Sequence, residues 1–301
     1  MTAVSAPFPA PRSAAATGGG LRRPLLVAVG DNVVDCYPQL GVLYPGGNAV
    51  NVAVNAARLG APSAYIGVVG TDAAGRVVES ALRSEGVDVS RLRIVEGTNA
   101  AATVHLEEGN RHFVGADTGV SRFRVNDGDL SLVGQAAIAH TGECSMLEED
   151  LGALASSAQI LSFDFSERDL DYVEAYAPHV QIATLSRPAI GTQEAVQMAM
   201  AVSELGPQTV AITMGERGAL VLHDGHVITA TAPDTDDVID TLGAGDAFIA
   251  RLLVGIATGE TMSSLVAAAT SYASATCLSK GAFGYESPLT FEPPGSLSTA
   301  H

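Results

Sequence analysis

AVNVAVNAARLGAPSAYIGVVG, residues 49–70, has the pattern of a helix followed by a strand. Apolar side chains recur at helical spacing through residues 49–60, and Gly60 ends the pattern. AYIGVVG (64–70) is a continuous apolar run of strand length, as is LLVAVG (25–30) upstream. A strand, a helix and a second strand in this order form the unit from which parallel sheets are built. The stretch therefore predicts an α/β fold.

The same alternation continues to about residue 278. Helical spacing covers four further segments, 74–86, 192–206, 243–257 and 262–278. Strand patterns cover 136–142, 160–165, 180–185 and 208–215, and a hairpin is expected around Asp224-Gly225. We expect a mostly parallel central sheet covered by helices on both faces, with ligands bound beyond the carboxyl ends of its strands.

Three stretches depart from this alternation. TNAAATVHLEEGNRHFVG (98–115) alternates polar and apolar residues and predicts a β-hairpin turning at Glu108-Gly109-Asn110, which could cover a cleft as a lid. Residues 1–24 are rich in Ala, Pro and Gly and lack the pattern of a secretory signal. We expect a disordered N-terminal tail there and a second loose tail at 290–301.

The composition excludes several classes of protein. A formal net charge of −17 over 301 residues repels nucleic acid and anionic membranes, and no apolar run is long enough to cross a bilayer. Cys36, Cys144 and Cys277 are far apart and form no C-x-x-C pair, so no disulfide framework or zinc site is expected. We expect each of them to fill the core or line a cleft, in a reducing, cytoplasmic setting.

DTLGAGDAF (240–248) carries the strongest chemical signal. Gly243 and Gly245 let the backbone approach a ligand closely, and the apolar spacing that follows predicts a helix whose first amides are open to an anion. Asp246 falls in the first turn, where a carboxylate is favoured. The stretch can therefore hold a transferring phosphoryl group beside a base; the alternative is an ordinary capped helix after a glycine turn.

Other machinery for phosphate or hydrolytic chemistry is absent from the sequence. The chain has a single lysine, Lys280, and no glycine-rich loop precedes it, so there is neither a P-loop nor a protein-kinase site. GVVGTDAAGR (67–76) misses the dinucleotide-binding spacing and indicates a structural glycine turn. No H-E-x-x-H or G-x-S-x-G pattern occurs, which argues against metallohydrolase and serine hydrolase chemistry.

Further polar clusters lie where strands end and helices begin. TMGERGALV (213–221) predicts a tight loop after a strand, which could hold a nucleotide beside the phosphate site. GDNVVD (30–35) and PGGNAVN (45–51) contain four donors and acceptors suited to a polyhydroxy ligand, namely Asp31, Asp35, Asn48 and Asn51. Each of these four side chains could instead be a helix cap or a turn residue.

PGGNAVNVAVNAARLG, GVVGTD and DTLGAGDAF together resemble the ribokinase-like, or PfkB, family of carbohydrate kinases, over about residues 25–288. The resemblance implies a three-layer sandwich at 25–289 with a small β-sheet lid at about 36–45 and 98–118. Within the family, GDNVVDCYPQLG, GGNAVNVAV and SFDFSER look most similar to the fructoselysine 6-kinases. One departure is the segment TLSRPAIGTQEA (184–195), which lacks the N-x-x-E motif tied to Mg²⁺ and phosphate, and in which Ser186 stands near the missing asparagine.

The resemblance also implies roles for particular residues. Asp246 matches the catalytic base, and the anion hole corresponds to Gly243, Ala244 and Gly245. Nucleotide contacts are implied for Thr213, Gly215, Glu216, Gly218 and Gly245. Sugar contacts are implied for Asp31, Asp35, Gly46, Gly47 and Asn51. A monovalent cation such as K⁺, bound in many members, would lie near Asp240, Leu242, Thr276, Ser279 and Gly281.

We therefore expect an ATP- and Mg²⁺-dependent kinase acting on a primary hydroxyl of a sugar or fructosamine, which could form a homodimer through its lid. One alternative is a family kinase for fructose, ribose or a nucleoside. Another is a non-catalytic sugar or nucleotide sensor on the same fold, against which the intact Asp246 and its glycines argue. A Rossmann-type oxidoreductase is disfavoured because no dinucleotide fingerprint is present.

Overall fold

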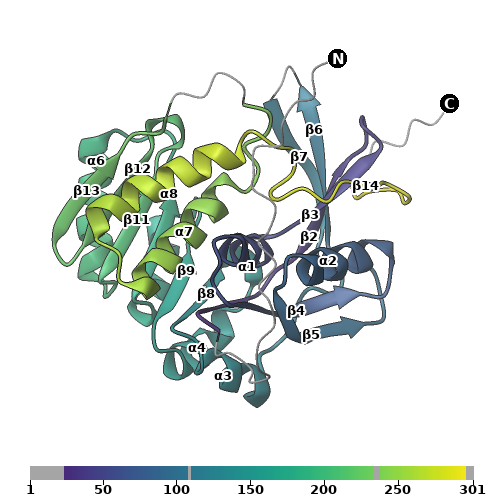
Figure 1. The fold of residues 1–301 in the computed structure, drawn as a ribbon, viewed down its shortest axis with the longest axis horizontal. Helices are drawn as coiled ribbons and strands as arrows, with labels where there is room; N and C mark the ends of the chain where they lie inside the picture. Colours follow the sequence, from purple (N-terminus) through teal and green to yellow (C-terminus); the bar gives the residue numbers. More distant parts are fainter. Residues whose placement is uncertain (1–23, 108–109, 234–237, 296–301) are drawn as a thin grey trace.

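The computed structural model describes residues 24–107, 110–233 and 238–295. A large sheet lies between two layers of helices, and a smaller sheet stands to one side of it (Figure 1). Residues 1–23 of the expected N-terminal tail and residues 108 and 109 of the expected hairpin turn lie outside the described residues. Within the described ranges, no helix combines the length and the hydropathy needed to span a bilayer.

Nine strands form the large sheet, in the order β13-β12-β11-β10-β9-β8-β1-β4-β5. Their bounds are β1 (Leu26–Val29), β4 (Ser63–Gly70), β5 (Asp88–Val95), β8 (Ile138–Gly142), β9 (Leu161–Asp164), β10 (Ile182–Ser186), β11 (Thr209–Thr213), β12 (Ala219–His223) and β13 (His226–Ala230). All neighbours are parallel except β11 with β12 and β12 with β13, the latter pair forming the hairpin at Asp224-Gly225. The predicted α/β class and mostly parallel sheet are confirmed.

Helices cover both faces of this sheet. Their bounds are α1 (Asn48–Arg58), α2 (Ala73–Ser84), α3 (Asp127–Val133), α4 (Leu151–Ser157), α5 (Leu170–Tyr176), α6 (Thr192–Glu204), α7 (Ala244–Thr258) and α8 (Met262–Thr276). One core contains Leu26 and Ala28 of β1 together with buried residues of α1, α2, α7 and α8. Val27 and Val29 face the other core, with buried residues of α3 to α6. Successive residues of a strand point to opposite faces, so a strand covered on both sides is apolar throughout.

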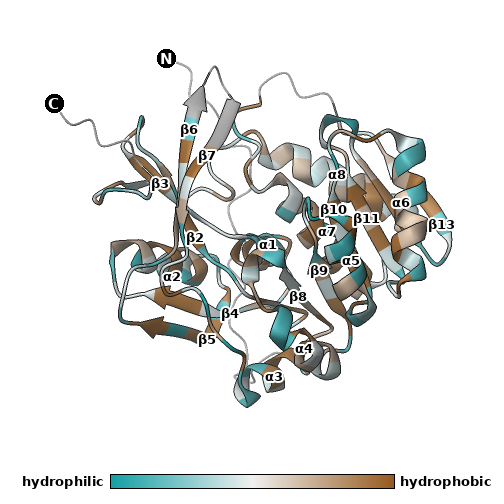
Figure 2. Ribbon diagram, turned by 180° about the vertical axis from the view of Figure 1, so that it is seen from behind, coloured by the Kyte–Doolittle hydropathy of each residue, from teal (hydrophilic) through white to brown (hydrophobic). Residues whose placement is uncertain are grey.

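The distribution of hydropathy follows from this layering. The strands of the large sheet are largely hydrophobic, whereas hydrophilic residues gather on the helices that cover it (Figure 2). Two of the cysteines, Cys36 and Cys277, are buried as expected. Cys144 does not fill the core: it is exposed, because it lies in a short 3₁₀ turn (Glu143–Ser145) beyond the end of β8.

Three elements of the large domain were not predicted from the sequence. Helices α3 and α5 have seven residues each, about two turns, which is too short for a helical period to stand out. Strand β5 lies at the edge of the sheet and carries Arg91 and Arg93 among its half-buried residues. Edge strands are often charged, so β5 lacks the apolar run by which central strands are recognised.

The smaller sheet contains the predicted hairpin. Its order is β14-β3-β2-β6-β7, from β2 (Val33–Tyr37), β3 (Val42–Gly46), β6 (Ala101–Glu107), β7 (Asn110–Asp117) and β14 (Ser287–Pro288). Strand β2 begins before residue 36, where the lid was expected to start, so Asp35 lies within a lid strand and not in a loop after β1. The described residues of the expected C-terminal tail contact this sheet, because Thr103 donates a hydrogen bond to the carbonyl of Pro294.

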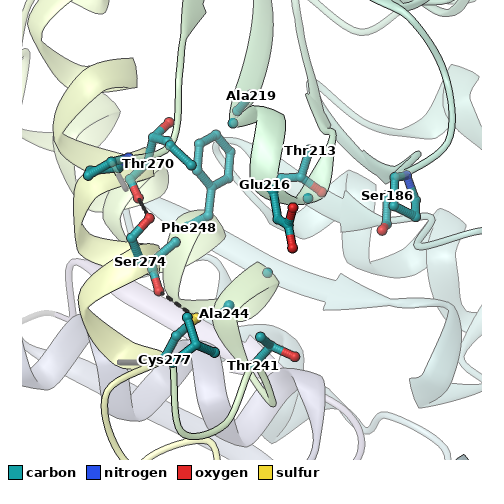
Figure 3. Close-up of a pocket in the computed structure, with 18 of the residues that line it drawn as sticks. Ser186, Thr213, Glu216, Ala219, Thr241, Ala244, Phe248, Thr270, Ser274 and Cys277 are labelled. Carbon is teal, nitrogen blue, oxygen red and sulfur yellow. Dashed lines mark hydrogen bonds between the residues drawn. The ribbon is translucent and has the colours of Figure 1, made fainter. Parts of the chain in front are cut away.

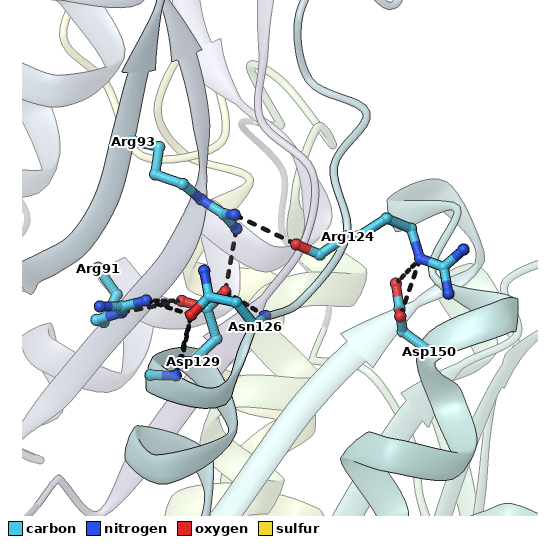
Figure 4. A network of polar contacts seen from close by, with 7 residues as sticks. Arg91, Arg93, Arg124, Asn126, Asp129 and Asp150 are labelled. Carbon is cyan, nitrogen blue, oxygen red and sulfur yellow. Dashed lines mark hydrogen bonds and ion pairs between the residues drawn. The ribbon is translucent and has the colours of Figure 1, made fainter.

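An ion-pair network ties the edge strand β5 to α3. Arg91 and Arg93 both donate to the carboxylate of Asp129, whose side chain is 0% exposed (Figure 4). The same carboxylate accepts from the backbone N–H of Asn126, which caps α3 in return. Asp129 therefore pairs with two guanidinium groups and also completes a helix cap.

Replacing Asp129 by Ala is expected to lower the free energy of unfolding by about 3 kcal/mol, near the lower end for a broken buried ion pair, because both arginines are about one-third exposed. Urea unfolding measures this loss. Asp127→Ala is the matched control, since Asp127 is an exposed acid in the same helical turn. Equal losses for the two variants would contradict a stabilising role of the network.

Candidate active site

The amino end of α7 forms one wall of the site. Gly243 adopts a left-handed conformation with φ 74°, and a Cβ there would lie 2.5 Å from the Cβ of Ala282. The amide of Ala244 donates to the carbonyl of Thr241 at 3.3 Å. Among the described residues, the amides of Gly245 and Asp246 have no hydrogen-bond acceptor. The turn therefore leaves two N–H groups able to bind an anion at the start of a 15-residue helix.

The carboxylate of Asp246 is held by two amide side chains of α1. Asn48 Nδ2 donates to its Oδ1 and Asn51 Nδ2 to its Oδ2, each at 2.7 Å. Desolvation in the cleft raises the pKa of Asp246 to about 7, helped by the negative charge of Asp164, although the two amides oppose the rise. Asp246 remains partly exposed, so it can act as a proton acceptor near neutral pH.

Asp164 is a second carboxylate at this position, to which the sequence analysis assigned no role. It ends β9 and accepts hydrogen bonds from Asn48 Nδ2 at 3.1 Å and from the Thr184 hydroxyl at 2.9 Å. Burial raises its pKa to about 6. An acid at the carboxyl end of a predicted strand is a recognisable signal, since ligands bind at that edge of a parallel sheet.

The predicted sugar residues gather where β2, β3 and α1 meet. Asp31 caps α1, because its carboxylate accepts from the backbone N–H of Asn48 at 2.8 Å and of Ala49 at 3.2 Å. Asp31 therefore serves as a helix cap, and its predicted sugar contact stays a prediction. Asp35 is buried on β2, and a Cβ on Gly46 would come within 2.6 Å of its Oδ2.

Gly47 follows with φ 107°, and a Cβ there would lie 2.7 Å from the Cα of Asn32. The glycine pair thus lets the turn between β3 and α1 pass close to Asp35 and Asp31.

A cavity of about 900 Å³ opens on the other side of the α7 amino end. The predicted nucleotide residues line it together with apolar and hydroxyl side chains of α7 and α8 (Figure 3). The lining includes Thr213, Gly215, Glu216, Gly218, Ala244, Gly245, Phe248, Thr270, Ser274 and Cys277. Figure 3 shows Thr213, Glu216 and Ser186 facing Thr270, Ser274 and Cys277 across this space.

The residues that line the cavity fit a nucleoside triphosphate with a divalent cation. Phe248 and Ala219 offer apolar surface for a base, and the open amide of Gly245 suits a phosphate. Glu167 and Glu216 supply carboxylate oxygens, which are the hard ligands that Mg²⁺ prefers. Glu167 was missed from the sequence, although it stands in the quoted segment SFDFSER just after β9.

The two segments expected to bind a monovalent cation also lie together. The carboxylate of Asp240 accepts from the backbone N–H groups of Leu242 and Gly281, both at 3.0 Å, and Asp240 N donates to the carbonyl of Cys277. The hydroxyl groups of Thr276 and Ser279 bond to carbonyls of their own helix end. Among the described residues, no three His, Cys, Asp or Glu side chains are grouped as metal ligands.

Comparisons with known proteins identify the family of the chain. The sequence model described as "pfkB family carbohydrate kinase" matches residues 27–286. The chain is 39% identical over 277 residues to the fructosamine kinase FrlD of Bacillus subtilis (strain 168), covering 90% of this chain and 97% of that protein. It is 35% identical over 261 residues to the fructoselysine 6-kinase of Escherichia coli (strain K12), covering 86% and 99%.

Among solved structures, ribokinase of Arabidopsis thaliana complexed with ribose and ATP superposes with a TM-score of 0.76. The identity is 22%, and the alignment covers 87% of this chain and 95% of that one. This likeness shows a ribokinase-like fold, as expected from the sequence motifs.

Proposed function

The chain belongs to the pfkB family of carbohydrate kinases, and from this premise we propose that it transfers the γ-phosphoryl group of ATP to a primary hydroxyl of a fructosyl amine. As a member of that family it is an ATP-dependent sugar kinase; the fructosyl amine is the proposed part. The observation that carries the mechanism is Asp246, held by two amides beside open N–H groups at the edge of a large cavity.

In the proposed mechanism, Asp246 accepts the proton of the attacking hydroxyl. Its pKa of about 7 leaves it ionised above neutral pH and basic enough to take a proton. The amides of Gly245 and Asp246, which have no acceptor among the described residues, stabilise the charge that develops on the transferred group, and the predicted anion hole is thereby shifted because the Ala244 amide donates to the carbonyl of Thr241. ATP supplies that group when bound, and closure of the lid would exclude water that competes with the sugar.

Sugar binding is proposed for Asp35 and Asn51 with the backbone at Gly46 and Gly47, while Asp31 shapes the site as the cap of α1. Asn51 supports this role, because its Oδ1 is buried and has no hydrogen-bond partner in the described part of the chain. A hydroxyl group of a substrate would satisfy that oxygen, which otherwise costs free energy to bury.

For the nucleotide we propose contacts with Thr213, Gly215, Glu216 and Gly218, and for Mg²⁺ the carboxylate of Glu167. Glu167 lines the same cavity as Ser186, and its carboxylate can replace the acid of the missing N-x-x-E motif. Glu167→Gln is expected to raise the Mg²⁺ concentration for half-maximal activity about tenfold, the lower range for an impaired metal site. Titration of activity against Mg²⁺, and calorimetry of ATP binding with and without Mg²⁺, measure this effect.

Glu194→Gln is the matched control, because Glu194 is an exposed acid in the first turn of α6 and does not line the cavity. An equal increase in the Mg²⁺ requirement of both variants would indicate a general loss of negative charge and contradict the assignment to Glu167.

A K⁺ site and a dimer are further proposals. The backbone N–H groups of Leu242 and Gly281 both donate to the carboxylate of Asp240, so the two segments expected to bind a monovalent cation lie together, which supports a K⁺ site there. Phe113 and Val114 of the lid edge strand β7 are 62% and 49% exposed, which supports a second copy of the chain as the partner. Kinase assays in KCl and in NaCl test the K⁺ site, and analytical sedimentation tests the dimer.

The cytoplasmic setting and the domain bounds stay predictions.

Release of ADP, followed by a coupled assay, tests the substrate. Fructoselysine and other fructosyl amino acids should show kcat/KM about 10⁴-fold above fructose and ribose, as expected where a site hydrogen-bonds a group that the competitors lack. A preference for fructose, ribose or a nucleoside would replace the proposed substrate, while leaving a kinase. No turnover of any sugar, with tight binding retained, would favour a sensor.

The pH dependence gives a separate test of the base. Because the ionised form of Asp246 is required and its pKa is raised to about 7, kcat/KM should fall about tenfold per unit below neutral pH. The apparent value belongs to the coupled pair with Asp164. Asp164→Asn removes a negative charge and should move this acid limb to lower pH. A wild-type profile that stays flat down to pH 5 would contradict the assignment.

A further inference from the structure

A chain of hydrogen bonds runs from the interior of the large sheet to Asp246. The Ser162 hydroxyl on β9 lies 3.1 Å from His140 Nδ1 on β8, and His140 Nε2 lies 3.0 Å from Asn48 Oδ1 on α1. Asn48 Nδ2 then donates to Asp246 and to Asp164. No motif in the sequence pointed to His140, which is separated from Asn48 by 92 positions.

The chemistry of the partners decides the direction of every bond in this chain. Ionised carboxylates can only accept, so the amide nitrogen of Asn48 must face Asp246 and Asp164. Its oxygen then faces His140, which has to donate from Nε2. A neutral imidazole with its proton on Nε2 accepts at Nδ1, and the Ser162 hydroxyl can donate there.

Burial keeps this imidazole neutral. His140 and Ser162 are both 0% exposed, and desolvation lowers the pKa of His140 to about 3. A neutral donor fixes the orientation of the Asn48 amide without adding a charge beside the carboxylates. Asn51, the other amide on Asp246, has no hydrogen-bond partner on its oxygen within the described structure. Only one of the two amides is therefore anchored from behind.

The charged groups that face Asp246 make this anchor important. They are Asp164 from the end of β9 and Asp31 from the end of β1, and Glu143 adds its charge to Asp164. All of these groups are acids, so the negative charge of each one disfavours ionisation of its neighbours. If the Asn48 amide rotated by half a turn, its oxygen would face the carboxylates of Asp246 and Asp164 and repel them. The two carboxylates would also lose the hydrogen bonds that Asn48 Nδ2 donates.

We propose that His140 is a positioning residue of the kinase, which holds the Asn48 amide so that its N–H groups face Asp246 and Asp164. This inference rests on the role of Asp246 in the proposed function. His140 touches no substrate; it acts through Asn48. Its effect should therefore appear in the ionisation of the base and not in the binding of nucleotide.

Three substitutions test the role. His140→Leu removes the donor, so the acid limb of kcat/KM should shift upward by about one pH unit, the size expected for a lost hydrogen bond to a charged group. His140→Gln can donate from nearly the same place as Nε2 and should restore the wild-type limb, whereas His140→Asn reaches only the position of Nδ1 and should not. The KM for ATP should stay within about twofold in all three, since none of them touches the cavity.

A double-mutant cycle locates the effect. In an Asn48→Ala background the acid limb should already be shifted, and adding His140→Leu should move it no further. An additional shift in that background, or failure of Gln to restore the limb, would overturn the proposal. If Asp246→Asn keeps full turnover, the base itself is wrongly assigned. If Asp246→Asn is inactive while His140→Leu keeps the wild-type limb, only the positioning role fails.

Nitrogen-15 NMR of the wild-type protein provides a readout that needs neither substrate nor a folded variant. His140 should be neutral from pH 6 to 8, with its proton on Nε2. A proton on Nδ1, or a charged ring in this range, would contradict the proposal even if the variants at position 140 do not fold.

Discussion

Asp246→Asn is expected to lower kcat by a factor of about 100 or more while ATP still binds, because the loss of a general base typically costs between about 10² and 10⁴ in rate. Asparagine keeps the size of the side chain but cannot accept a proton from the sugar hydroxyl. The nucleotide cavity is lined by other residues, so the affinity for ATP should change by no more than about threefold. Steady-state kinetics and calorimetry measure the two quantities.

The control for this variant is Asp127→Asn. Asp127 also occupies the first turn of a helix, but it is exposed on α3 and contributes nothing to the candidate site. Its kcat should equal that of the wild type. An unchanged kcat in Asp246→Asn would show that Asp246 is not the base. If the variant lost both its activity and its ability to bind ATP, the fold would be damaged.

Gly243→Ala should reduce kcat about a hundredfold by displacing the first turn of α7. At φ 74° an L side chain is strained, and the added Cβ would lie 2.5 Å from Cβ and 2.9 Å from Cα of Ala282. Relief of that contact requires the backbone to move, and the open amides move with it. Misplacing groups at the reacting centre by about 1 Å can cost a factor of about 10². Single-turnover rates report the effect on the chemical step.

Gly259→Ala is the control that separates the effect of backbone strain from the effect of displacing the amides at the start of α7. Gly259 ends the same helix with the same φ of 74°, and a Cβ there would meet nothing within 4 Å. It should cost about 1 kcal/mol of stability, as for a left-handed alanine, and leave kcat unchanged. Equal losses of kcat at both glycines would show that helix stability, and not the placement of the amides, limits the reaction.

Much of the fold followed from local pattern. The apolar spacing of 49–60, 74–86 and 192–206 corresponds to α1, α2 and α6, and the continuous apolar runs correspond to strands buried on both faces. Strand β5 and the seven-residue helices α3 and α5 were not predicted, because an edge strand and a two-turn helix do not need the apolar patterns by which longer buried elements are recognised.

Some residues of the candidate site could be predicted from the sequence and others could not. Gly243 and Asp246 lie within four positions, so a turn, a helix start and an acid in its first turn could be derived from DTLGAGDAF alone. Asp31 could not be assigned, because a carboxylate after a strand suits a helix cap and a sugar ligand equally well. Only the position of the α1 amides around it shows that Asp31 is a cap.

The sequence by itself determined the layered α/β fold, the lid hairpin and the open helix end with its acid, because each depends on residues that are neighbours along the chain. The tertiary structure alone decided what surrounds that acid. Asn48 is 198 positions from Asp246, and Asp164 and His140 come from separate strands that meet it only at the carboxyl edge of the sheet. The pKa of a carboxylate depends on the burial, charges and hydrogen bonds around it, which no local pattern specifies.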